Sequence, residues 1–330
     1  MEDSINIRIY LKSLNLTAEN ASRWINSMCY FEPTEMISKK MTSGKVKKFN
    51  HKKFYEAIKE EIENSDRASM MIKDKINTIS INKGSIRNDI ATISCNLSYD
   101  IYEINKCNIM ELVDEYIKEY EGIVAYACSL EDMFWQNNEN IVMYDIKGKS
   151  KEELHTKKSD IFPDDVIVDT EFNPGHSHIV DGIWFGACWR MWYGKEYSKY
   201  IPMDIFSNFK NCYENRLYSN DFIRITLYEN LWEYDKKENR DRQWEFRKSV
   251  GVDELVSILE NNDTISFDID AAIEITAGVF EHGGIRLIKH YYNDKGELIV
   301  KSQAIEVKTY ELGVEGQLLW SETKKIVNSR

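Results

Sequence analysis

The feature that most constrains the fold is a run of aromatic and small residues, GIWFGACWRMWYG, at positions 182–194. In an extended strand successive side chains point to opposite faces, so Trp184 and Trp192 share one face while Trp189 and Tyr193 share the other. Both faces are therefore apolar. A strand of this kind has to be buried on both sides, which predicts a central strand in a sheet that other layers cover.

The same run supports a second interpretation. Tryptophan, tyrosine and arginine are the residue types most enriched at the energetic centres of protein–protein interfaces. On this interpretation one end of the run presents Trp184, Arg190, Trp192 and Tyr193 to a protein partner. Burial in the core is the default, and the sequence leaves both interpretations open.

Periodic patterns elsewhere predict a mixture of strands and helices. Apolar residues alternate with polar ones over 5–11, which is the pattern of a half-buried strand, and Thr17 is placed to cap a following helix. A longer helix is predicted over 109–120, with Asn108 as its N-cap and Gly122 just beyond its end. Antiparallel hairpins around such helices favour an α+β fold with mixed, largely antiparallel sheets packed with helices.

The rest of the chain continues this mixture. A further helix is predicted over 240–259, with a break at Gly251. Further strands are predicted at 123–127, 141–144, 166–168, 222–228, 265–269, 273–279, 285–292 and 298–307. These segments suggest three parts: an N-terminal α/β extension over 1–76, an α+β core over 77–261 and a β-rich C-terminal segment over 262–330.

The net charge argues against a nucleic-acid partner. The chain carries 55 Asp and Glu against 43 Lys and Arg, a formal net charge of −12 at pH 7. Affinity for a duplex comes mostly from Lys and Arg at phosphates, so a nucleic-acid binder is disfavoured. An acidic surface suits a basic protein partner better, because complementary charge speeds the encounter of two proteins.

Three features of the sequence indicate a cytoplasmic protein. The start, MEDSINIRIYLKSL, lacks the continuous apolar stretch of a signal peptide. No stretch approaches the roughly 18 apolar residues of a membrane span. The six cysteines are scattered without a CxxC pair, so we expect reduced thiols instead of zinc ligands or disulfides.

The segment VIVDTEFNPGHSHIVDG holds the candidate chemistry. On a strand, Asp169 and Glu171 would point the same way, and two carboxylates can hold a divalent ion. His176 and His178 form an H-x-H pair that could add zinc ligands. These four residues make a metal-dependent nuclease or hydrolase an alternative function. The adjacent Pro-Gly turn favours a structural role, in which the histidines bond to backbone groups.

Other catalytic signatures do not occur in the sequence. It has no G-x-S-x-G elbow, no G-x-G-x-x-G and no phosphate-binding G-x-x-x-x-G-K-[ST] loop. We therefore expect neither a serine triad nor a nucleotide site, and no cofactor.

The turn and the aromatic run together resemble a known family. Asn173, Pro174 and Gly175, followed by the MWYG that ends in Gly194, are similar to the NPG…MWxG core of the Immunity protein 52 family. Members of this family are bacterial proteins that neutralise polymorphic toxins. The similarity covers roughly residues 79–259, and His176 stands where the family pattern has an arginine.

The resemblance implies a protein that binds and does not catalyse. Its partner would be a cognate toxin, whose active or essential surface it covers in the cytoplasm of the producing cell or its kin. The acidic charge of the chain is compatible with a basic toxin. Asn173 to Gly175 and Trp184 to Gly194 would then serve as scaffold or partner-binding positions. A phage-defence or counter-defence protein that acts by protein contact is a third hypothesis. The sequence leaves the oligomeric state open.

Overall fold

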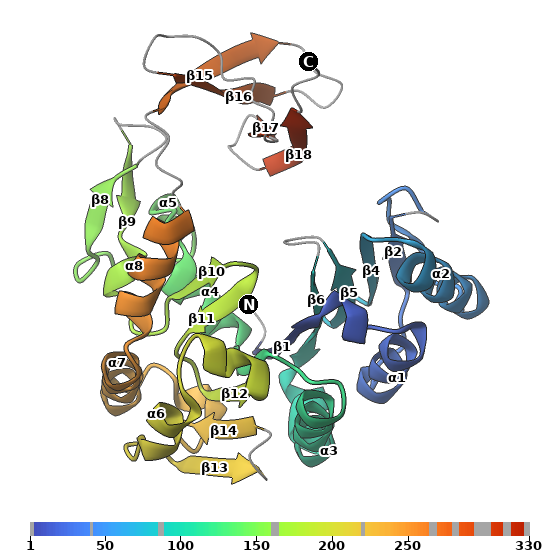
Figure 1. Cartoon of the computed structure of the whole chain (residues 1–330), viewed down its shortest axis with the longest axis vertical. Helices are drawn as coiled ribbons and strands as arrows, with labels where there is room; N and C mark the ends of the chain where they lie inside the picture. The colour runs from blue at the N-terminus through green and yellow to red at the C-terminus, as the bar shows by residue number, and fades with distance from the viewer. Residues whose placement is uncertain are drawn as a thin grey trace. The chain divides into compact units, whose positions relative to one another are not determined.

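The computed structural model describes residues 3–39, 42–84, 89–159, 165–218, 222–263, 269–278, 284–293, 305–312 and 318–326, with side chains as far as Glu260 (Figure 1). Contacts divide the chain into two compact units, Met1–Leu259 and Glu260–Arg330. The predicted division into three parts stays a prediction. The first of those parts contributes strands to the same sheet as the second.

The first unit is built on a ten-stranded antiparallel sheet, which confirms the predicted α+β class. In spatial order its strands are β13 (Glu214–Tyr218), β14 (Phe222–Thr226), β12 (Arg190–Gly194), β7 (Val124–Ser129), β1 (Ser4–Lys12), β6 (Ile90–Ser98), β5 (Thr78–Lys83), β4 (Ala68–Lys73), β2 (Glu35–Ser38) and β3 (Lys47–Lys48). Two small sheets pair β8 (Thr156–Lys158) with β9 (Val166–Val168), and β10 (Ser177–Val180) with β11 (Ile183–Gly186).

Eight α-helices and four short 3₁₀ segments lie in the described residues. The helices are α1 (Ala18–Met28), α2 (His51–Asn64), α3 (Tyr99–Glu119), α4 (Leu130–Asn137), α5 (Val142–Ile146), α6 (Met203–Asn208), α7 (Lys237–Val250) and α8 (Val252–Asp263). The 3₁₀ segments are η1 (Ser13–Asn15), η2 (Thr170–Phe172), η3 (Lys195–Lys199) and η4 (Leu231–Glu233). As expected, Thr17 caps α1, by accepting from the backbone N–H of Asn20.

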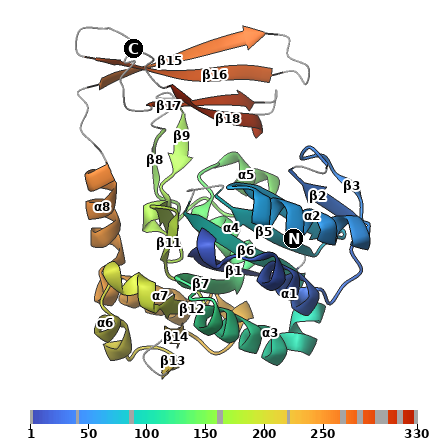
Figure 2. The same ribbon diagram turned by 45° about the vertical axis from the view of Figure 1, so that its right-hand side comes forward.

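The two faces of the sheet are covered by different elements. α1, α2 and α3 contact the sheet and lie together on one side of it (Figures 1 and 2). Ile9 and Trp192 lie in register with Ala125 on that face, and the Trp192 indole donates to Asp114 of α3. Arg8 lies in register with Tyr126 on the opposite face, where α4 and β11 pack.

The aromatic run forms two strands, and the prediction of one strand over 182–192 is wrong. β11 pairs with β10 in a small sheet, whereas β12 lies between β7 and β14 inside the large one. The break falls at Ala187 and Cys188, next to Gly186, where small side chains let the chain pass from one layer to the next. Both strands are buried, as expected for a segment that is apolar on both faces.

Two other predictions need correction. α3 begins at Tyr99, so Asn108 lies inside the helix and does not cap it; the buried ring of Tyr102 extends the apolar face by two turns. The segment 141–144 is not a strand, because Val142–Ile146 forms α5, whose Tyr144 packs on Trp135 at 4.7 Å. A short apolar run does not distinguish a helix from a strand by its periodicity.

The break at Gly251 is confirmed. This residue has φ of 73°, a left-handed conformation that glycine adopts without steric cost, and it separates α7 from α8. The second unit contains a four-stranded antiparallel sheet in sequence order, formed by β15 (Ile269–Gly278), β16 (Gly284–Asn293), β17 (Ile305–Leu312) and β18 (Leu318–Ile326). The predicted strand segments 265–268, 279 and 298–304 lie outside the described residues.

Candidate functional site

The two predicted metal carboxylates do not share a strand face. Asp169 follows β9 and caps η2, where its side chain accepts from the backbone N–H of Glu171 at 3.4 Å. Lys157 pairs with both carboxylates, at 3.3 Å from Asp169 and 4.0 Å from Glu171. The prediction that Asp169 and Glu171 lie together on a strand is therefore wrong. The cation between the two carboxylates is the ammonium group of Lys157.

The NPG turn is fastened to the end of α4. The Asn173 side chain donates to the carbonyl of Gln136 at 3.0 Å, and the Gly175 N–H donates to the Gln136 side-chain oxygen at 2.8 Å. Pro174 lies between them, partly buried. A Cβ at Gly175 would lie 2.8 Å from Gln136 Cγ, so only glycine permits this approach.

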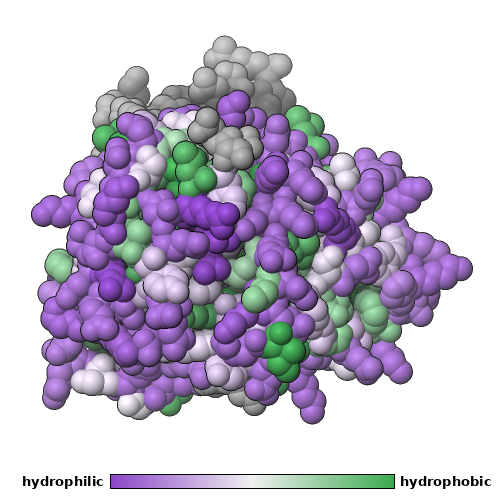
Figure 3. Space-filling view, turned by 90° about the horizontal axis from the view of Figure 1, so that it is seen from below, coloured by the Kyte–Doolittle hydropathy of each residue, from purple (hydrophilic) through white to green (hydrophobic). Residues whose placement is uncertain are grey.

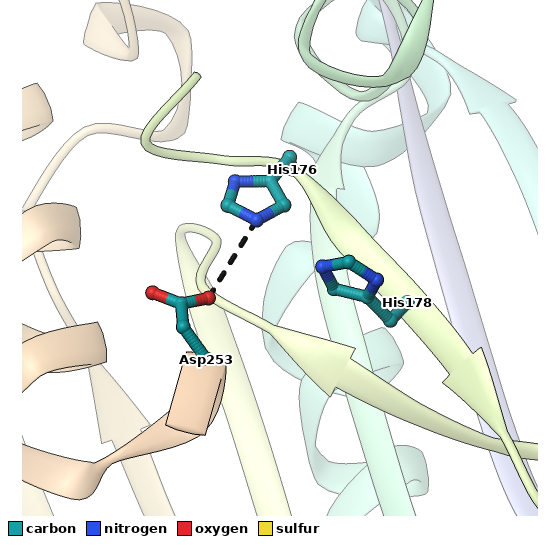
Figure 4. Close-up of side chains that lie close together, drawn as sticks. All are labelled: His176, His178 and Asp253. Carbon is teal, nitrogen blue, oxygen red and sulfur yellow. Dashed lines mark ion pairs between the residues drawn. The ribbon is translucent and has the colours of Figure 1, made fainter. Parts of the chain in front are cut away.

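The histidine that follows this turn is part of a hydrogen-bonded cluster, which we call the His176 clamp: His176, Arg247 and Asp253. Figure 4 shows two of its members, His176 and Asp253. His176 Nδ1 donates to the carbonyl of Asn173 at 2.5 Å, and its Nε2 accepts from Arg247 at 2.5 Å. Arg247 is completely buried; it also donates to the carbonyl of His176 at 2.6 Å and holds Asp253 with two of its nitrogens.

This bonding pattern fixes the charge of the imidazole. Burial and the neighbouring Arg247 lower the pKa of His176 from 6.5 to about 4. The ring is therefore neutral at pH 7, with its proton on Nδ1. Arg247 remains charged, although burial lowers its pKa, because Asp253 opposes the effect of burial.

Among the residues that the structure describes, one set of potential metal ligands gathers. Ligand atoms of His176, His178 and Asp253 lie within 4.8 Å of one another (Figure 4). Asp169 and Glu171 are not part of this set, so the four predicted ligands are not brought together. Arg247 already donates to both His176 and Asp253, and its charge opposes a cation at the same position. The geometry suits a structural clamp that joins the NPG turn to the start of α8.

The predicted partner-binding aromatics are core residues in this structure. Trp184, Trp192 and Tyr193 have 4%, 0% and 2% of their surface exposed. The Tyr193 ring stacks on Phe206 at 3.9 Å. Gly194 has a packing role as well, because a Cβ at this position would lie 1.9 Å from the carbonyl oxygen of Gly122.

Arg190 differs from these neighbours, because it lines a surface groove of about 770 Å³. We call it the α3 groove; it lies between α3, the start of β12 and the segment 229–233. Its aromatic residues are Tyr99, Tyr102, Trp189, Tyr213 and Trp232. Neighbouring ring centroids among Tyr99, Tyr102, Trp189 and Trp232 lie 5.2 to 6.4 Å apart. Sequence reasoning missed Trp232, whose only signal is a lone tryptophan in the polar stretch ENLWEY.

Charge in the α3 groove is divided between its floor and its rim. On the floor, Arg190 stacks on Trp189 at 4.5 Å and donates to the Thr226 hydroxyl at 2.8 Å. The Trp232 indole donates to Glu103 at 2.9 Å. The remaining acidic residues of the lining are Glu111, Glu229 and Glu233, and the first two are exposed.

The surrounding surface is largely hydrophilic. Figure 3 shows hydrophobic residues as small, separate patches on the face that it presents. Single exposed apolar side chains such as Leu14 and Ile104 are ordinary for a folded domain. None of the helices in the described residues is long and apolar enough to cross a membrane.

Comparison with known proteins gives one distant similarity to report. No family model matches the chain, and no curated protein does. Among solved structures, the chain is similar to the Pseudomonas aeruginosa T6SS protein PA0821 at 10% sequence identity. The match covers 76% of this chain and 72% of that chain, with a TM-score of 0.46. At this level the likeness supports no functional conclusion.

Proposed function

We propose that this chain is a non-catalytic protein-binding protein that neutralises a cognate toxin by covering its active or an essential surface. The α3 groove is the observation that carries the proposal. Its walls are tryptophan and tyrosine, the types that dominate interface energetics. The similarity of the NPG and MWYG motifs to the Immunity protein 52 family supplies the kind of partner.

The groove suits a basic side chain of the partner. Arg190 and Arg224 on its floor lie near Asp114 and Glu214, which offset their charge. The rim adds Glu111 and Glu229, for which the structure shows no cationic partner in the described residues. An arginine or lysine entering the groove would meet aromatic faces and these carboxylates, both of which attract cations.

The absence of catalysis is part of the proposal and has its own support. The histidine of the candidate cluster is neutral and hydrogen-bonded at both ring nitrogens, so neither nitrogen is free to act as a base. The proposed location is the cytoplasm of the producing cell, where the toxin would be met.

The experiment is protection of a growing cell from the toxin encoded beside this gene. Co-expression should restore growth, and the two proteins should purify as a complex. The double variant Glu111→Lys, Glu229→Lys should weaken the complex by about ten-fold or more, because it reverses charge at the proposed contact. Glu63→Lys, an exposed change on α2, alters the charge as much as Glu111→Lys or Glu229→Lys alone does; it is the control for each single variant and should leave affinity unchanged.

Two results would count against the proposal. One is failure to protect against any neighbouring toxin together with no stable protein partner. The other is equal weakening by the groove variant and by Glu63→Lys, which would point to net charge and not to the groove.

A metal-dependent nuclease or hydrolase is the second candidate, favoured by the approach of His176, His178 and Asp253. It requires a metal ion in the purified protein and phosphodiesterase activity with Mg²⁺ or Mn²⁺ that His178→Ala abolishes. Metal-free protein without such activity would dispose of this candidate. A prophage or defence cluster around the gene, with no toxin gene, would instead favour a defence or counter-defence protein.

A further inference from the structure

A charged side chain lies on the central strand of the sheet without an acidic partner. Arg8 is the fifth residue of β1, which lies between β6 and β7. Its cross-strand neighbours are Ser94 on one side and Tyr126 on the other. Within the part of the chain that the structure describes, no carboxylate forms an ion pair with its guanidinium.

Two polar atoms at this position are buried and have no hydrogen-bond partner, namely Arg8 Nε and the hydroxyl of Tyr10. Tyr10 is completely buried. Burial acts to lower the pKa of Arg8, but Tyr126 and Tyr10 raise it and the net direction is upward, so the guanidinium stays charged. Arg8 as a whole is half-buried, but its Nε and the Tyr10 hydroxyl are buried, and buried polar atoms without a hydrogen-bond partner are costly.

Both groups line a pocket of about 570 Å³, which we call the Arg8 pocket. Its aromatic wall is formed by Tyr126 and Trp184, whose ring centroids lie 4.8 Å apart. Its polar side includes Asn137 and Ser177, which are fixed to each other because the Ser177 N–H donates to the Asn137 side chain at 2.8 Å. This volume is in the range of pockets that hold small molecules.

We infer that the Arg8 pocket binds a carboxylate group attached to an apolar or aromatic body. The planar fork of a guanidinium matches the two oxygens of a carboxylate, and the Tyr10 hydroxyl adds a further donor. The aromatic wall accommodates the body of the ligand. Arg8 is the one cationic residue of the lining and can face one negative charge, whereas the second charge of a phosphate dianion would have no cation opposite it and would lie in a lining that also contains Glu139.

The inference is independent of the proposed toxin binding. Arg190 of the α3 groove lies in register with Ala127, whereas Arg8 lies in register with the adjacent residue Tyr126. Neighbouring residues of a strand point to opposite faces, so the two sites lie on opposite faces of the sheet. A ligand in the Arg8 pocket therefore leaves the α3 groove open.

The test is titration of the full chain with 3-phenylpropionate. Binding is measured by calorimetry and by the ¹⁵N NMR signals of the arginine Nε atoms. Saturable binding is expected, with a shift of one Nε signal. The neutral 3-phenylpropionamide and inorganic phosphate should bind about ten-fold or more weakly, because the amide loses the charge-matched fork and phosphate lacks the apolar body that packs on the aromatic wall. N-acetylphenylalanine distinguishes the two sources of a carboxylate, since tighter binding of this probe indicates a peptide C-terminus and tighter binding of 3-phenylpropionate a free acid.

Variants locate the site. Arg8→Gln should lower affinity by about ten-fold or more and Tyr10→Phe by a smaller factor, whereas Arg23→Gln on the surface of α1 should have no effect. If Arg8→Gln does not fold, the comparison of acid with amide in the wild-type protein decides. Equal affinity for acid and amide, or no saturable binding of any probe, would overturn the inference. The variant Glu111→Lys, Glu229→Lys should bind 3-phenylpropionate with wild-type affinity. Acid binding in the Arg8 pocket is therefore tested separately from toxin binding in the α3 groove.

Discussion

At the scale of single residues, the most informative side chain is Arg247. It is completely buried and bonds at once to the imidazole and carbonyl of His176 and to Asp253. These contacts connect positions 71 residues apart and convert a candidate metal-binding histidine into a neutral hydrogen-bond acceptor. Because the guanidinium is shielded from water, the cluster should govern stability more than surface ion pairs do.

The His176 clamp should make stability depend on pH. The pKa of His176 is about 4 in the folded chain and 6.5 as a model value, so the unfolded chain binds a proton that the folded chain does not between these values. Stability should therefore be full above pH 6.5 and fall by about 3 kcal/mol as the pH decreases to about 4. Urea unfolding at pH 7 and pH 4.5 measures the difference.

The neutral variant His176→Gln should lose less stability than the wild type over that interval, because it has no group to protonate there. His155→Gln removes an exposed imidazole and should retain the wild-type dependence. Equal pH dependence in all three proteins would show that the pKa of His176 does not differ between the folded and the unfolded chain.

Arg247→Lys should destabilise the chain. A lysine keeps the charge but does not reach both oxygens of Asp253 and the imidazole with one planar group. The Asp253 side chain is 44% exposed, so the main cost is the loss of hydrogen bonds at the buried end of residue 247, about 1–3 kcal/mol, which urea unfolding at pH 7 would detect. Lys248→Met, at the next and exposed position, should stay within about 0.5 kcal/mol of the wild type.

At the scale of elements, the glycine of MWYG explains how β12 joins the sheet. Its N–H donates to the carbonyl of Ile123 at 2.9 Å, and the position of its missing side chain is taken by the carbonyl of Gly122. The end of β12 therefore approaches the turn after α3 backbone to backbone. This close backbone contact explains why the MWYG motif ends in a glycine.

Gly194→Ala should disturb this junction. The added methyl would lie 1.9 Å from the Gly122 oxygen, so the backbone has to move. Overpacking of this kind costs about 1–3 kcal/mol, measurable as a lower urea midpoint. Lys195→Ala tests the neighbouring exposed position, and an equal loss there would contradict the steric explanation.

Sequence patterns predicted elements well where one face is apolar and a local signal marks the ends. β1 and α1 are examples, with a clear alternation and a capping threonine. Sequence patterns gave wrong predictions where small residues interrupt an apolar run, as at Ala187, and where a short run has no periodicity, as at 141–144. In both cases contacts with distant elements decide the conformation, since burial is available to either a strand or a helix.

At the scale of the whole molecule, the unit over Met1–Leu259 contains the entire ten-stranded sheet and the extended hydrophobic core. A chain that ends after residue 263 should therefore fold by itself, with a single cooperative thermal transition and native near-ultraviolet circular dichroism. Loss of the cooperative transition in this shortened chain would mean that the core depends on residues 264–330.

The candidate sites were predictable only in part. The NPG turn and its histidine stood out in the sequence, but their contact with Arg247 did not, because nothing local joins positions 71 residues apart. The α3 groove joins Glu103 to Trp232, which are 129 residues apart. The Arg8 pocket escaped notice because Arg8 falls on the polar face of an ordinary alternating strand.

The sequence by itself determined the local properties of this protein: the alternation of β1, the cap of α1, the break at Gly251, the acidic charge and the buried character of the aromatic run. Each of these properties depends on residues that are neighbours in the sequence or on the overall composition of the chain. Only the tertiary structure decided which charges meet. Strand order brings Arg247 to His176 and leaves Arg8 without an acidic partner, and the energy of a charge depends on its distance from others and from water, which local periodicity does not specify.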